Sequence, residues 1–177
     1  MREVVLYIAM SLDGYVADET GGADWLEGHG EGPEGADSYS RFIQEVDTVI
    51  MGRNTYRQVT TQLSPERWVY QGLHTYVVTH HPLSSTHDIT FTAEHPCALI
   101  RRLRQGPGKS IWICGGPSIL SPLMEEDIID RYHIAVIPTI LGSGIRLFGA
   151  LEEARKLRLL NTQASDEIGR ASCRERV

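Results

Sequence analysis

Short runs of β-branched and apolar residues alternate with helix-like segments along this chain of 177 residues. Five such runs are typical of strands, and they lie at residues 3–9, 47–51, 74–79, 110–114 and 132–141. Where strands are separated by helices, the strands usually lie side by side in one parallel sheet that helices cover. This alternation therefore predicts an α/β fold of three layers with a mainly parallel central sheet.

The segments between these runs carry helix signals. Helices are expected at residues 36–45, from residue 96 to about residue 104, and from the Gly-Gly-Pro-Ser segment at 115–118 to about residue 125, with a short helical turn at 52–56. In the first of these, apolar residues recur at steps of three and four, with Asp37 or Ser38 as the N-cap. Residues 88–92 alternate like an edge strand, residues 157–162 read as a further strand, and residues 11–35 read as a long loop rich in Gly, Asp and Glu.

Length and composition indicate one domain, which we place at residues 1–166. Residues 167–177 show neither helical nor strand periodicity and are similar to the translated read-through of a sequencing adapter, so we interpret them as a non-native tail. If this interpretation holds, a natural terminal strand is missing from the sheet.

Charge and cysteine content narrow the function further. The formal net charge of −6 argues against a nucleic-acid-binding surface, which needs an excess of Lys and Arg. No apolar run is long enough to cross a membrane, and no leader is evident, so we expect a cytoplasmic protein. The three cysteines form no Cys-x-x-Cys pair, and the neighbouring His80 and His81 point to opposite sides of an extended chain, so no metal site is expected.

Phosphate-binding residue types follow three of the predicted strands. Gly52, Arg53 and Thr55 follow one strand, Thr79 and His80 end another, and the segment 115–118 follows a third. Paired glycines let a phosphate approach the backbone, a helix N-terminus attracts it, and an arginine fork matches its oxygens. The carboxyl ends of parallel strands share one edge of the sheet, so this edge is the expected ligand site.

Three further residues suit a site that holds a flat ring. Trp25, in the Gly-rich loop, is either a local plug or a stacking platform. Asp13 and Asp37 are the candidates for a catalytic acid, although an Asp at a helix start is by default a cap. The residues alone do not decide between these two carboxylates.

Four motifs in order resemble the dihydrofolate reductase superfamily, and in particular the reductase (RibD C-terminal) domain of the bifunctional riboflavin-biosynthesis enzyme and its stand-alone relatives. They are IAMSLDGYVA at 8–17, VIMGRNTY at 49–56, ICGGPS at 113–118 and ILGSGIRLF at 140–148. The resemblance implies a dihydrofolate reductase-like α/β/α fold, an NADPH cofactor, hydride transfer to a flat nitrogen heterocycle, and a homodimer.

The resemblance also implies roles for individual residues. Ala9 would lie near the nicotinamide, and Gly144 and Arg146 would join Trp25 around the substrate. The residues that would hold the phosphates, the pyrophosphate and the riboses of the cofactor are Gly52, Arg53, Thr55, Thr79, His80, Gly115, Gly116, Ser118 and Ile119. Such enzymes often hold a 2′-phosphate with Ser and Arg, where this chain has Thr79 and His80, so NADH is left open.

Three functions are compatible with the residues and with this resemblance. The first is a general NADPH-dependent reductase of pteridines or aminopyrimidines. The second is 5-amino-6-(5-phosphoribosylamino)uracil reductase of riboflavin biosynthesis, and the third is a non-catalytic dinucleotide-binding protein.

Overall fold

The computed structural model describes residues 1–26, 33–81, 83–151, 153–165 and 168–175, and only the backbone of residues 33–37, 164–165 and 168–175. The strands in chain order are β1 (Val4–Ser11), β2 (Tyr15–Ala17), β3 (Val46–Gly52), β4 (His74–Val78), β5 (Ile89–Thr92), β6 (Ser110–Gly115), β7 (Arg131–Ile137), β8 (Ile145–Arg146), β9 (Leu157–Ser165) and β10 (Ile168–Glu175). The helices are α1 (Pro33–Glu45), α2 (Arg53–Gln58), α3 (Pro96–Gln105) and α4 (Pro117–Glu125), with a 3-10 turn η1 (Asp24–Leu26) and a π-helical turn η2 (Val59–Leu63).

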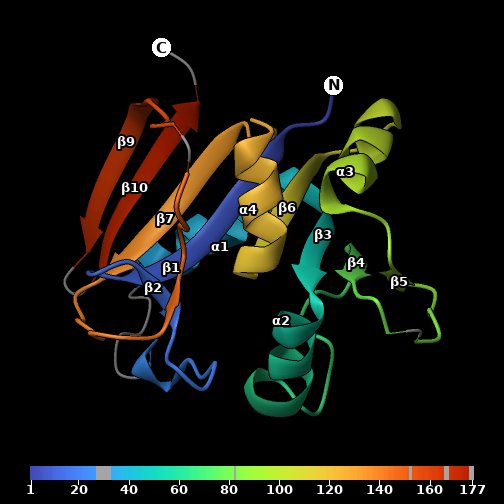
Figure 1. Cartoon of the computed structure of the whole chain (residues 1–177), viewed down its shortest axis with the longest axis horizontal. Helices are drawn as coiled ribbons and strands as arrows, with labels where there is room; N and C mark the ends of the chain where they lie inside the picture. The colour runs from blue at the N-terminus through green and yellow to red at the C-terminus, as the bar shows by residue number, and fades with distance from the viewer. Residues whose placement is uncertain (27–32, 82, 152, 166–167, 176–177) are drawn as a thin grey trace.

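The described strands form one eight-stranded sheet and a separate two-stranded ribbon of β2 and β8 (Figure 1). The order across the sheet is β5-β4-β3-β6-β1-β7-β10-β9. Neighbours are parallel from β5 to β7, and only β10 pairs antiparallel, with β7 on one side and β9 on the other. The mainly parallel sheet predicted from the sequence is therefore confirmed, with β5 at an edge as expected.

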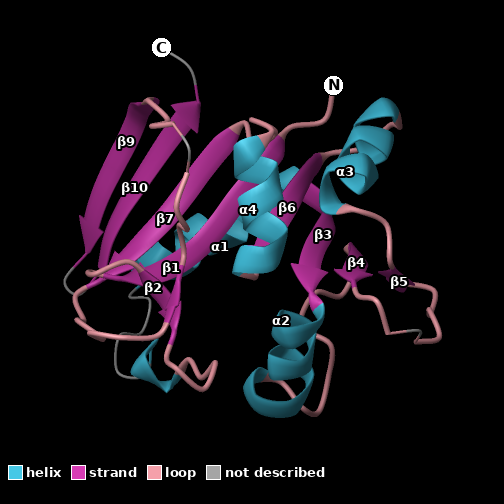
Figure 2. Cartoon of the chain, in the orientation of Figure 1, coloured by secondary structure: helices cyan, strands magenta, loops and turns pink. Residues whose placement is uncertain are grey.

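Helices cover both faces of this sheet, as Figure 2 shows with α3 and α4 in front and α1 behind. On the front face, Leu99 of α3 and Leu123 of α4 belong to one buried cluster with Leu6 of β1. On the other face, Phe42 of α1 packs with Trp112 of β6. Successive strand residues point to opposite faces, so central strands such as β1 and β3 supply residues to both clusters.

Two predicted boundaries are wrong for reasons that prolines explain. Helix α1 begins at Pro33, where a proline has the right φ and needs no amide partner, so Asp37 lies inside the helix and is not its cap. Strand β7 ends at Ile137, before Pro138, because proline cannot donate to a strand ladder.

No described helix is long and apolar enough to span a membrane.

The tail also differs from expectation, since residues 168–175 form β10 between β7 and β9. The tail is therefore part of the sheet, although no regular structure was expected for it; whether a natural terminal strand is missing depends on the origin of the tail. Strand pairing uses main-chain N–H and C=O groups that every residue except proline has, so a segment without a clear apolar period can still fill the position between two strands. The non-native origin of the tail stays a prediction.

Candidate active site

A crevice is expected where β1 and β6 separate near their carboxyl ends. β1 pairs with β6 only as far as Leu6 and Ile113, but continues along β7 to Ser11. Near that point, the Trp112 indole nitrogen donates a hydrogen bond to the Tyr7 carbonyl oxygen at 3.0 Å. The chain then leaves β1 toward α1 on one face and leaves β6 through α4 on the other, which is the arrangement that opens a ligand site in α/β sheets. Ala9 lies half-buried on β1 beyond the separation point.

The glycines that end β3 and β6 meet beside this crevice. A Cβ atom at Gly52 would lie 3.5 Å from Ile119 Cγ1 and 3.8 Å from Ser118 Oγ, and one at Gly116 would lie 3.6 Å from Thr55 Oγ1. Gly115 has a φ of +141°, a backbone conformation that residues other than glycine rarely adopt. A Cβ atom at this position would lie 3.4 Å from Ile8 Cδ1. The structure thus brings Gly52, Thr55, Gly115, Gly116, Ser118 and Ile119 into one cluster, which we call the glycine cradle.

The electrostatics of the cradle favour an anion. Helix α4 starts at Pro117 with Gly116 as its N-cap, and no side chain caps it, so the positive end of its dipole faces the cradle. Helix α2 starts at Arg53, and both Arg53 and Ser118 are exposed. These groups suit the oxygens of a phosphate.

Thr79 and His80 follow β4, the next strand beyond β3. Thr79 is buried, with its amide bound to the Thr92 carbonyl at 2.8 Å, and its hydroxyl accepts the His81 amide at 3.1 Å. His80 is exposed. Both residues therefore lie at the same edge of the sheet as the cradle, one strand further out.

Asp13 joins the turn between β1 and β2 to the loop between β7 and β8. Its carboxylate accepts hydrogen bonds from the Ser11 hydroxyl at 2.6 Å and from the amides of Leu141 and Gly142 at 3.1 and 2.7 Å. These donors, Ser11 first, lower the pKa of Asp13 to about 2, so the side chain is ionised near neutral pH. The geometry gives Asp13 a tethering role and does not support the proton-donor role that the sequence suggested.

The predicted substrate residues Gly144 and Arg146 lie on this ribbon. Gly144 has a φ of +137° and packs directly on the Ala17 carbonyl, while the Arg146 guanidinium lies 4.7 Å from the centre of the Tyr15 ring. The ribbon and the α2 side of the site are joined where the Gln58 side chain donates to the Gly21 carbonyl at 3.2 Å. Gly144 and Arg146 thus lie on or next to the ribbon and form a group separate from the cradle.

Trp25 lies in η1, in the segment that follows the ribbon strand β2. Its indole nitrogen is buried and has no hydrogen-bond partner among the described residues. An unpaired buried donor costs about 1 to 3 kcal/mol, which a ligand acceptor would relieve. Asp37, the other predicted acid, has its side chain outside the described residues.

A neutral thiol lies next to the cradle, on the α1 face. Cys114 precedes Gly115, and its sulfur is 3.3 Å from the Tyr70 hydroxyl. Burial raises the pKa of Cys114 to about 11, and burial likewise raises the pKa of Tyr70. Both groups are therefore protonated near neutral pH, which argues against a thiolate nucleophile at this site.

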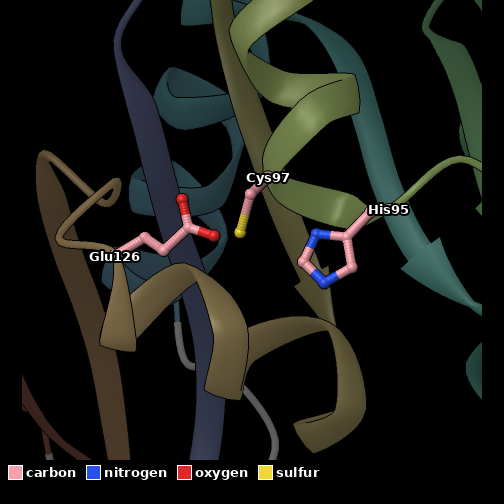
Figure 3. A group of neighbouring side chains, drawn as sticks. All are labelled: His95, Cys97 and Glu126. Atoms are coloured by element: carbon pink, nitrogen blue, oxygen red, sulfur yellow. The ribbon is translucent and has the colours of Figure 1, made fainter.

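Sequence reasoning missed one cluster of chemically capable side chains. His95, Cys97 and Glu126 each place a ligand-type atom within 4.8 Å of the other two, on the α3–α4 face of the sheet (Figure 3). The only local signal was the His-x-Cys spacing at residues 95–97, because Glu126 comes from a different helix. This cluster is separate from the glycine cradle, because the two lie at opposite ends of α4.

Comparisons with known proteins agree with this architecture. The model of the family described as the RibD C-terminal domain matches residues 2–168. YwjB of Bacillus subtilis (strain 168) is 48% identical over 164 residues, covering 92% of this chain and 91% of that protein.

Two solved structures are similar over nearly the whole chain. A putative riboflavin biosynthesis protein from Shewanella sp. PV-4 has a TM-score of 0.84 at 26% identity, with 99% of each chain covered. The diaminohydroxyphosphoribosylaminopyrimidine deaminase/5-amino-6-(5-phosphoribosylamino)uracil reductase from Thermotoga maritima has a TM-score of 0.73 at 17% identity, and the match covers 98% of this chain but 56% of that one. With a family model that spans almost all of its length, and with a fold similar to that of the Shewanella protein, this chain belongs to the RibD C-terminal domain family.

Proposed function

We propose that this protein is an NADPH-dependent reductase that transfers hydride to a flat nitrogen heterocycle of the aminopyrimidine or pteridine type. The observation that carries the proposal is the glycine cradle, where the uncapped N-terminus of α4, three glycines and Thr55 meet near the point where β1 and β6 separate. Family membership supports the same reading.

In this proposal the cradle holds the pyrophosphate of the cofactor. Gly115, Gly116 and Ser118 lie around the pyrophosphate, while Arg53 and Thr55 contact phosphate oxygens. Thr79 and His80 meet the adenosine ribose one strand further out, and Ala9 lies next to the nicotinamide. When bound, the cofactor supplies the hydride, and the chain supplies position and electrostatics.

The substrate would lie against the ribbon and η1. Trp25 offers an aromatic face and an unpaired indole N–H that can donate to a ring nitrogen or a carbonyl oxygen. Gly144 and Arg146 would form the rim, with the Arg146 guanidinium above the Tyr15 ring. Because Asp13 is ionised and fully engaged, its part is to hold this rim in place, and Asp37 stays the candidate acid.

A second candidate is the reduction of 5-amino-6-(5-phosphoribosylamino)uracil, which the name of the Thermotoga maritima protein includes. Its substrate carries a phosphate, and the exposed Arg146 is the cation on the ribbon that would meet it. Arg146→Gln should then raise the KM for the phosphorylated aminouracil, with the unphosphorylated ring unaffected. If no heterocycle is turned over while NADPH still binds, the third candidate, a dinucleotide-binding protein without catalysis, takes precedence.

The deciding experiment is a titration of the protein with NADPH and with NADH, followed by tryptophan fluorescence and by calorimetry. Arg53→Ala should weaken NADPH binding by about 1.5 to 3 kcal/mol, or roughly 10- to 150-fold in Kd, for the loss of a charge-assisted hydrogen bond. Arg57→Ala is the matched control, because Arg57 is equally exposed on the same helix but one turn away from the cradle. Equal effects of the two substitutions would remove Arg53 from the site, and no binding of either dinucleotide would refute the proposal.

Turnover is tested next with dihydrofolate, pterins and aminouracils, by the loss of NADPH absorbance. The predicted homodimer is tested separately, by light scattering of the same samples.

A further inference from the structure

The N-terminus of α3 and the C-terminus of α4 bring together three side chains of the types that bind transition metals. His95 immediately precedes α3, Cys97 lies in its first turn, and Glu126 immediately follows α4. Their ligand atoms, an imidazole nitrogen, a thiol sulfur and a carboxylate oxygen, all lie within 4.8 Å of one another. Figure 3 shows the Cys97 sulfur between the Glu126 carboxylate and the His95 ring.

These separations leave room for one ion at the centre. For three atoms no more than 4.8 Å apart, there is always a point within about 2.8 Å of all three. Zn²⁺ binds sulfur at about 2.3 Å and nitrogen or oxygen at about 2.0 to 2.2 Å. Each ligand atom therefore has to move by about 0.8 Å or less, which small side-chain rotations supply.

None of the three side chains is committed to a structural role that ligation would break. His95 is the N-cap of α3, yet its side chain makes no capping hydrogen bond. The Cys97 thiol makes a long bond, 3.4 Å, to the Pro122 carbonyl and also interacts with the Glu126 carboxylate, its proposed neighbour in the site. Glu126 pairs with Arg101, and this pairing orients the carboxylate, as partners of metal ligands commonly do.

We propose that His95, Cys97 and Glu126 form a binding site for Zn²⁺ or a divalent ion of similar preference, with water in the remaining position. A thiolate, an imidazole and a carboxylate around one ion match the donor set and the open coordination of zinc. His95 and Glu126 are exposed, so water can enter, while Cys97 is buried and shielded from bulk solvent. Burial, with Glu126 beside it, raises the pKa of the Cys97 thiol to about 11, so the bound ion displaces the thiol proton to solvent.

This site is independent of the proposed reductase site. The cradle lies at the start of α4 and Glu126 follows its end, and nine helical residues span about 13 Å. A bound ion would tie α3 to α4 on the front face of the sheet, so its expected effect is on stability rather than on hydride transfer.

The test uses the full chain, freed of metal with a chelator and titrated with Co²⁺ under reducing conditions. We expect one equivalent to bind, with a thiolate-to-cobalt charge-transfer band and strong visible bands typical of four-coordinate cobalt, and Zn²⁺ should displace it. Cys97→Ser should abolish the charge-transfer band, and His95→Ala and Glu126→Gln should each weaken binding by at least about tenfold. The matched controls Glu125→Gln, His87→Gln and Cys173→Ser should bind Co²⁺ like the unchanged protein.

Thermal unfolding gives a second test of binding that does not depend on the absorption bands of cobalt. Zn²⁺ at 100 times its Kd should raise the melting temperature by about 5 to 10 °C, and Glu126→Gln, a change at an exposed side chain, should cut this rise to about half or less at the same Zn²⁺ concentration. The proposal is wrong if no charge-transfer band appears, or if the band survives Cys97→Ser. It is equally wrong if His95→Ala and Glu126→Gln both leave the affinity unchanged, because the ion would then sit on a lone thiol.

Discussion

Gly144, which directly precedes β8, packs so closely on β2 that there is no room for a side chain. A Cβ atom at this position would overlap the Ala17 carbonyl oxygen and would also lie 3.1 Å from Asp18 Cα, and both are backbone atoms that cannot rotate away. The φ of +137° adds strain for any residue but glycine. Gly144→Ala should therefore push β2 and β8 apart and cost at least the two residue pairs that join them, Tyr15 with Arg146 and Ala17 with Ile145.

Gly142→Ala isolates the backbone part of this cost. Gly142 also has a positive φ, of +77°, but a Cβ there would meet nothing within 4 Å. Its expected cost is about 1 to 2 kcal/mol, the penalty for a left-handed non-glycine residue. Gly144→Ala pays a similar penalty and in addition loses about two hydrogen bonds near 1 kcal/mol each, so it should be roughly 2 kcal/mol less stable than Gly142→Ala.

Urea unfolding followed by circular dichroism measures the difference. With an m-value of about 2 kcal/mol per M, the Gly144→Ala midpoint should lie about 1 M below that of Gly142→Ala. The reasoning is refuted if the two variants have the same midpoint, because the contact with Ala17 would then carry no energy.

Substitutions in two other regions of the molecule test the roles of Asp13 and of the hydrophobic core in stability. Asp13 has a folded-state pKa of about 2 against an ordinary 3.8, so its contribution to stability is complete above about pH 4 and is lost as the pH falls toward 2. The melting temperature of Asp13→Asn should accordingly be below that of the unchanged protein at pH 5, and the gap should narrow toward pH 2; a gap that is constant with pH would contradict the tethering role. Leu123 is fully buried between α4 and the sheet, so Leu123→Ala should lower the free energy of unfolding by about 2 to 5 kcal/mol, whereas Leu63→Ala, at a side chain 63% exposed, should change it by less than about 0.5 kcal/mol. Chemical denaturation of both variants measures this contrast.

The main sheet could be predicted because each of its parallel strands is a local pattern. Buried strands such as β3 and β6 each contain a run of apolar residues followed by glycine, and both the run and its end are visible in the sequence. The β2–β8 ribbon has no such pattern, since its strands have three and two residues. Tertiary contacts hold it instead, above all the bonds from Leu141 and Gly142 to Asp13.

The same distinction separates what could and could not be predicted of the candidate site. The cradle glycines follow two strands that lie side by side, so the rule that parallel strands end at one edge was enough to bring Gly52 and Gly115 together. No local rule reports that Asp13 meets amides 128 and 129 residues away, and it is these amides, with Ser11, that lower its pKa. Residue type thus identifies a carboxylate as capable of proton transfer, but the long-range donors around it decide whether it ever holds the proton.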